Sequence, residues 1–119
     1  MRSNFNFSFV DENITMVSGD TLAFNVIIKD QNGDAVTVDG ATFKASQYFE
    51  NSTTLAISKS LGDGITQDGA VLTVRLAPSD TVNLGDTFLY YDMDITVNSD
   101  RFTLYRGMMQ IERDVKTTV

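Results

Sequence analysis

The sequence predicts an all-β fold, an antiparallel β-sandwich of about 7–9 strands. Two observations lead to this class. Apolar residues recur at every second position through the longest patterned runs, which is the period of a strand with one buried face. Glycine and asparagine turn signals separate these runs at short intervals, and no run has the 3.6-residue period of an amphipathic helix.

Three runs alternate clearly, at residues 22–28, 71–76 and 88–97. In each, one set of positions is apolar and the set between them is mostly polar, so the apolar set is expected to form the core between two sheets. The residues predicted to face inward are Leu22, Phe24, Val26, Ile28, Leu72, Val74, Leu76, Leu89, Tyr91, Met93, Ile95 and Val97.

Three other segments are predicted as less regular strands, at 42–49, 54–59 and 101–112. The last of these alternates at its start, slips by one position at Gly107 and then resumes. A glycine at a change of phase indicates a bulge or a strand break.

Turn and cap signals connect the strands. Asn32-Gly33 and Asp68-Gly69 are typical of two-residue hairpin turns. Residues 78–84 open with proline and carry Ser and Asp suited to capping, so at most one short helical turn is expected there.

The tripeptide Gly-Asp-Thr occurs at 19–21 and again at 85–87, each time before a long alternating run. Glycine supplies a backbone conformation that other residues resist, aspartate caps the turn through its own side chain, and threonine starts the strand. The second copy follows the helical turn at 78–84, an arrangement that resembles the crossing before strand F of an immunoglobulin-like sandwich. The predicted sandwich is therefore immunoglobulin-like.

The composition excludes several kinds of chemistry. The chain contains no Cys and no His, which removes the usual ligands of zinc, haem and iron–sulfur clusters and the base of a Ser-His-Asp triad. The net charge of −7 disfavours binding to nucleic acid. We expect no catalytic residues, no cofactor and no metal site, so the protein is not expected to be an enzyme.

The 119 residues fit one domain. Residues 13–116 are expected to form the sandwich, and residues 1–12 an N-terminal arm or an edge strand. No apolar run is long enough to insert into a membrane, and the start lacks the pattern of a signal peptide. Synthesis in the cytoplasm is therefore expected.

The order of motifs resembles the N-terminal domain of phage baseplate upper proteins and related tail-fibre connectors, across about residues 14–116. A Gly-Asp-Thr turn opens a long strand, a glycine-containing hairpin region follows, and later elements lead into a Tyr-Asp strand and a closing Thr-Leu pattern. The matching positions are Gly19, Asp20, Thr21, Asp30, Gly33, Gly40, Thr81, Leu84, Gly85, Tyr91, Asp92, Met93, Ile95, Thr103, Leu104, Gly107, Met109, Ile111, Asp114 and Val115. This resemblance implies an immunoglobulin-like part of a virion that forms homo-oligomers and contacts other tail proteins.

Two acidic groups have both a plain and a functional interpretation. The segment 30–34, "DQNGD", has oxygen ligands at alternate positions like half of a calcium loop, but it is more typical of a hairpin turn. Asp92 and Asp94 are paired carboxylates of the kind that glycosidases use, although a solvated outer face explains them more simply.

Two sets of aromatic residues are candidate interface positions. Phe88 and Tyr90 share the outward face of their strand with Asp92. Phe5, Phe7 and Phe9 alternate with polar residues, so an extended arm places all three rings on one side. That arm either packs on its own sandwich as an edge strand or adds to a neighbouring subunit.

Three functions remain open at this point. The leading hypothesis is a structural component of a phage or prophage tail, in the baseplate, fibre or neck connector, located in the virion and acting by self-assembly. The alternative is a free-standing immunoglobulin-like module that binds carbohydrate or a cell surface through Phe88, Tyr90 and Asp92. A small hydrolase using carboxylates is the third.

Overall fold

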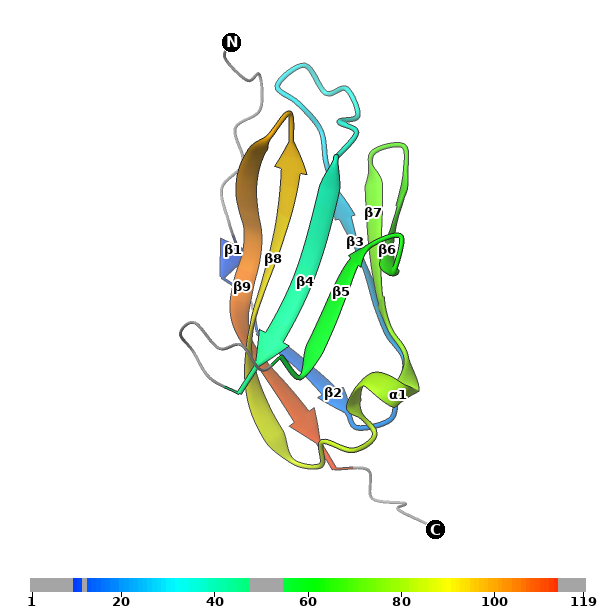
Figure 1. Ribbon diagram of the computed structural model, residues 1–119, viewed down its shortest axis with the longest axis vertical. Helices are drawn as coiled ribbons and strands as arrows, with labels where there is room; N and C mark the ends of the chain where they lie inside the picture. Colours follow the sequence, from blue (N-terminus) through cyan, green and yellow to red (C-terminus); the bar gives the residue numbers. More distant parts are fainter. Residues whose placement is uncertain (1–9, 12, 48–54, 114–119) are drawn as a thin grey trace.

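The computed structural model describes residues 10–11, 13–47 and 55–113, and it confirms the all-β class (Figure 1). In these ranges, nine strands and one short helix follow one another along the chain. They are β1 (Val10–Asp11), β2 (Ile14–Val17), β3 (Leu22–Ile27), β4 (Gly40–Ser46), β5 (Ile57–Leu61), β6 (Gly64–Asp68), β7 (Val71–Leu76), α1 (Pro78–Thr81), β8 (Thr87–Val97) and β9 (Asp100–Glu112).

The strands form one continuous, nearly closed sheet with a sandwich-like arrangement. Their order is β1-β9-β8-β4-β5-β6-β7-β3, with β2 also paired to β9. In Figure 1, β9, β8, β4 and β5 form the near layer, and β3 and β7 lie behind them. Most neighbours are antiparallel; the parallel pairs are β1 with β9, β2 with β9, and β5 with β6. No helix among the described residues is long and apolar enough to cross a membrane.

The core lies between the two layers, where the alternating pattern places it. Of the twelve residues predicted to face inward, all are buried except Leu22 and Phe24, which are partly buried against the same core. Phe43, from one of the weaker predicted strands, is fully buried. Its ring stacks on Tyr91 with centroids 5.5 Å apart and meets Phe24 edge-on at 5.9 Å, so aromatic contacts join β3, β4 and β8.

The bulge in the last strand is at Leu104, and its predicted position at Gly107 is wrong. Met93 pairs with Tyr105 while Asp94 pairs with Thr103, so Leu104 is the extra residue. Leu104 is itself buried. The register shift therefore moves the inward face of β9 from even to odd positions at Leu104, three residues before Gly107. Gly107 itself is in regular pairing with Tyr91.

The chain passes from the near layer to the far layer between β5 and β6, at a corner built from two glycines. Gly62 and Gly64 have φ values of +90° and +96°, a region that residues with a side chain rarely adopt. A Cβ on Gly64 would collide with the side chain of Lys59. Lys59 has little freedom to move away, because its Nζ lies 2.9 Å from a carboxylate oxygen of Asp80 in α1.

The helical turn predicted at 78–84 is present as α1, and it fixes the first Gly-Asp-Thr turn. The buried Thr81 accepts a hydrogen bond from the backbone N–H of Gly19 at its Oγ1 (2.9 Å) and one from Ser18 Oγ at its carbonyl oxygen (2.8 Å). In the second turn, Asp86 accepts a bond from the backbone N–H of Arg113 (2.6 Å). For Asp86, the prediction that the aspartate caps its own turn is thus replaced by a contact with the end of β9.

We predict that Gly64→Ala lowers the free energy of unfolding by about 1–3 kcal/mol, since it adds backbone strain to a clash with an anchored lysine. Urea denaturation of the two proteins measures this loss. Gly69→Ala is the matched control, because Gly69 has a φ of +61° and a Cβ added there would meet no atom within 4 Å, so it should cost about 1 kcal/mol. Equal losses for the two variants would contradict the role of Lys59.

Candidate functional site: the outer face of β4, β8 and β9

The pleat of β8 separates two sets of side chains. The odd-numbered residues from Leu89 to Val97 are buried, so the even-numbered ones point away from the core. On this outer face Tyr90 lies opposite Met108 of β9, and Asp92 lies between Lys44 of β4 and Arg106 of β9. The structure thus places an aromatic group beside a charged group on the same surface.

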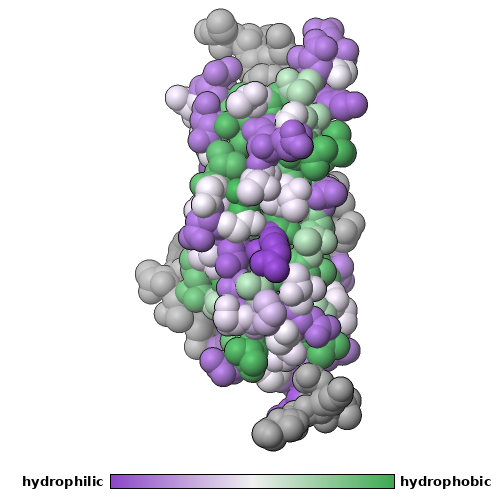
Figure 2. All heavy atoms as spheres, turned by 90° about the vertical axis from the view of Figure 1, so that its right-hand side faces the viewer, coloured by the Kyte–Doolittle hydropathy of each residue, from purple (hydrophilic) through white to green (hydrophobic). Residues whose placement is uncertain are grey.

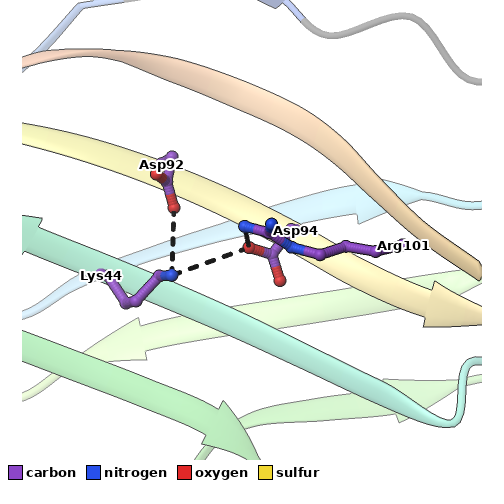
Figure 3. Close-up of polar contacts among 4 residues, drawn as sticks. All are labelled: Lys44, Asp92, Asp94 and Arg101. Atoms are coloured by element: carbon purple, nitrogen blue, oxygen red, sulfur yellow. Dashed lines mark hydrogen bonds and ion pairs between the residues drawn. The ribbon is translucent and has the colours of Figure 1, made fainter. Parts of the chain in front are cut away.

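The charged group is a cluster of ion pairs across three strands (Figure 3). Arg101 Nη2 donates to Asp94 Oδ2 at 2.7 Å, while Lys44 Nζ lies 3.9 Å from Asp94 Oδ2 and 3.9 Å from Asp92 Oδ1. In Figure 3 the ammonium group of Lys44 points between the two carboxylates. The hydrogen bond to Asp94, together with the negative charge of that carboxylate, raises the pKa of Arg101.

The simpler prediction for the two carboxylates, that both lie on a solvated outer face, is wrong for Asp94. Its side chain is only 9% exposed, whereas that of Asp92 is 43% exposed. A carboxylate can be buried at this position because two cations from neighbouring strands compensate its charge. Since Lys44 also pairs with Asp92, both carboxylates belong to one ion-pair cluster.

A glycosidase needs a different arrangement. One of its carboxyl groups donates a proton and so sits in a dry pocket away from compensating cations. Here the more buried carboxylate, Asp94, is the one that contacts both Arg101 and Lys44. The geometry suits an electrostatic anchor between strands rather than acid catalysis.

The aromatic group forms a small apolar area, which we call the β8–β9 patch: Phe88, Tyr90 and Met108. Phe88 is 55% exposed, Tyr90 38% and Met108 37%. Large aromatic side chains and methionine are enriched at protein interfaces. The interface residues predicted in β8 therefore lie together on the surface, joined by a methionine that the sequence did not single out.

The segment 30–34 forms a hairpin turn. The backbone N–H of Gly33 donates to the carbonyl oxygen of Asp30 (3.0 Å), and that of Asp30 donates to the carbonyl oxygen of Asp34 (2.9 Å). Asp30 Oδ1 accepts from the backbone N–H groups of Asn32 and Asp34 at 2.9 and 3.0 Å. Three residues, not two, make the loop, and Gly33 takes a φ of +85°. The Asp30 carboxylate therefore stabilises its own turn by accepting two backbone hydrogen bonds.

Other predicted sites can be placed only in part. Phe5, Phe7 and Phe9 lie outside the residues that the structure describes. Within the described ranges, no three acidic, His or Cys side chains come close enough together to hold a metal ion.

Sequence reasoning missed Lys44, Arg101 and Met108. Each lies on β4 or β9, whose registers with β8 are set by contacts across the core and by the bulge at Leu104. A signal existed for Lys44, a single charge in an otherwise uncharged run, "ATFKAS". No protein-family model matches the chain, and no curated protein matches it either.

We predict that Asp94→Asn lowers the free energy of unfolding by about 1–3 kcal/mol, because it removes the negative charge that pairs with Arg101 and Lys44 and leaves both cations beside a neutral amide. Asp92→Asn is the control; its side chain is more exposed and its pair longer, so a loss under about 1 kcal/mol is expected. Chemical denaturation at neutral pH measures both. A double-mutant cycle with Arg101→Gln should show coupling for Asp94, and additive losses in that cycle would refute the anchor.

Proposed function

We propose that this protein is a structural subunit that self-assembles through its β-sandwich, as a component of a phage or prophage tail in the baseplate, fibre or neck connector. The observation that carries the proposal is the β8–β9 patch, in which Phe88, Tyr90 and Met108 are all exposed on one sheet face. Burying such side chains between subunits is favourable, by roughly 1.5–3 kcal/mol for a fully buried large apolar residue. The sequence resemblance to tail connectors supports the virion as the place of assembly.

The surroundings of the patch support an interface. The ion-pair cluster of Lys44, Asp92, Asp94 and Arg101 lies on the same outer face, so an apolar centre has polar groups beside it. Interfaces between proteins commonly have this pattern of apolar core and polar rim. Figure 2 shows the side of the molecule that is at the right of Figure 1, where apolar side chains emerge in small separate groups between polar ones.

In this proposal the partners are other copies of the chain and other tail proteins, with no nucleic acid and no membrane insertion. The acidic net charge of −7 is consistent with this set of partners. No cofactor and no catalysis are proposed, since the carboxylates on the outer face are held in ion pairs.

A second candidate is an immunoglobulin-like module that binds carbohydrate. The observation that favours it is the position of Phe88 and Tyr90 on the same face as the half-exposed Asp92. Sugar rings pack on aromatic faces while carboxylates accept hydrogen bonds from their hydroxyl groups. In this case the protein is a monomer that binds glycans, and Phe88→Lys removes that binding without changing the mass in solution.

We predict that Phe88→Lys weakens self-association by about tenfold or more, because a charge replaces an apolar contact at the centre of the interface. Sedimentation velocity over a range of concentrations measures this change. Val82→Lys is the control, since Val82 is 56% exposed at the C-terminal end of α1 and is not one of the three residues of the patch. Unchanged assembly of Phe88→Lys, with Val82→Lys also unchanged, would contradict the role of the β8–β9 patch.

A further inference from the structure

β3 ends the strand order of the sheet and pairs only with β7 in the described part of the chain. The backbone N–H of Ile28 donates to the carbonyl oxygen of Ala70 (2.7 Å), on the side of β7. Hydrogen-bonding groups alternate sides along a strand, so the even-numbered residues bond to β7. The N–H and C=O groups of Ala23, Asn25 and Ile27 therefore point to the open edge.

This edge lacks the features that normally protect a strand from pairing with another chain. Natural edge strands carry lysine, proline, a bulge or an inward-pointing charge. The sequence of β3 is "LAFNVI", with no charged residue, proline or glycine. Its pairing with β7 runs without a register shift from Leu22 to Ile27, and Ile27 is 58% exposed.

An apolar groove lies beside the same edge. It has a volume of about 210 Å³ and is lined by Ile14, Leu22, Phe24, Asn25, Tyr91 and Tyr105. Leu22 and Phe24 are the two predicted core residues that are only partly buried, so the core is incomplete on this side. A strand added along β3 would direct every second side chain toward the groove.

We propose that the strand added to β3 is residues 1–9 of a second copy of this chain, with Phe5, Phe7 and Phe9 directed toward the groove. This inference rests on the proposed self-assembly and identifies one of its contacts. The segment is nine residues long and carries a phenylalanine at every second position from Phe5 to Phe9, which is the period that the edge and groove require. It contains Arg2 and no acidic residue, whereas the whole chain carries −7.

The second copy, rather than the same chain, is chosen because of where the described chain begins. Val10 and Asp11 pair with Tyr105 and Arg106 of β9, in the layer opposite to β3. Tyr105 lines the groove on the side opposite to β3, so for its backbone to pair along β3 the same chain would have to leave β9 and cross the groove immediately before Val10. The crossing between layers at β5–β6 uses two glycines at positive φ, whereas residues 1–9 contain neither glycine nor proline.

Two full-length variants test the proposal by complementation. The arm variant carries Phe5→Ser, Phe7→Ser and Phe9→Ser. The edge variant is Ala23→Pro, which removes an N–H at the open edge while leaving the bonds to β7 in place. Ala23→Val is its control, because it keeps the N–H. Thermal melts establish that each variant is folded, and sedimentation velocity and native mass spectrometry report its assembly.

We expect each variant alone to associate at least about tenfold more weakly than the unchanged chain, and Ala23→Val to associate normally. When the two variants are mixed, an intact arm from the edge variant meets an intact edge on the arm variant, so a 1:1 heterodimer should form. Weakened variants that do not complement each other would overturn the proposal and place the arm on its own chain. Variants that assemble like the unchanged chain would also overturn it.

If Ala23→Pro does not fold, amide hydrogen exchange of the unchanged chain gives the answer. Protection of Ala23, Asn25 and Ile27 should rise with protein concentration as the edge becomes paired, and protection that is independent of concentration would refute the proposal. The proposed function is tested separately by Phe88→Lys. If assembly depends on Phe88 but not on residues 1–9, the proposed self-assembly is supported and the proposed contact between the arm and β3 is refuted.

Discussion

The strict alternation of β8 is the constraint on which the other features depend. Its odd-numbered residues complete the core, with Tyr91 stacked on Phe43, so its even-numbered residues have no place inside. A shift of one position would bury the charges of Asp92 and Asp94 in the core and expose Leu89 and Met93. Burial of the odd-numbered residues of β8 therefore places its even-numbered residues on the outer face of the sheet. The bulge at Leu104 has the same effect in β9. It shifts the alternation by one residue, so that apolar residues face the core both before and after the bulge.

Contacts on both faces of the sheet hold β4 against β8. Inside, Phe43 and Tyr91 join β4 to β8; outside, Lys44, Asp94 and Arg101 join β4, β8 and β9. The apolar contacts account for most of the stability, since exposed ion pairs contribute little. The ion pairs add specificity of register: Asp94 finds Arg101 and Lys44 only when the three strands are aligned as observed. A buried carboxylate makes the wrong alignment costly.

The sequence was sufficient to predict the elements with strong local patterns, and insufficient for those set by distant contacts. The strands β3, β7 and β8 and the helix α1 follow from alternation, proline and turn residues, and so do ten of the inward-facing core residues. The bulge was misplaced because a change of phase can occur anywhere between two apolar positions, and only the pairing with β8 locates it. The burial of Asp94 was missed because Arg101 reaches it across a hairpin, and the pattern of one strand does not show what the neighbouring strand supplies.

The two surfaces proposed for assembly lie on different layers, and this separation limits the kind of object they can build. The β8–β9 patch is on the outer face of one layer, while the open edge of β3 belongs to the other. A contact in which an arm of one copy meets an edge of the next joins two different surfaces, so it propagates into a ring or a fibre unless arms are exchanged mutually. Each copy also carries −7, so the apolar contacts must outweigh repulsion between like charges. Because salt screens that repulsion and leaves apolar burial in place, assembly of this kind strengthens as ionic strength rises, whereas assembly held by complementary charges weakens.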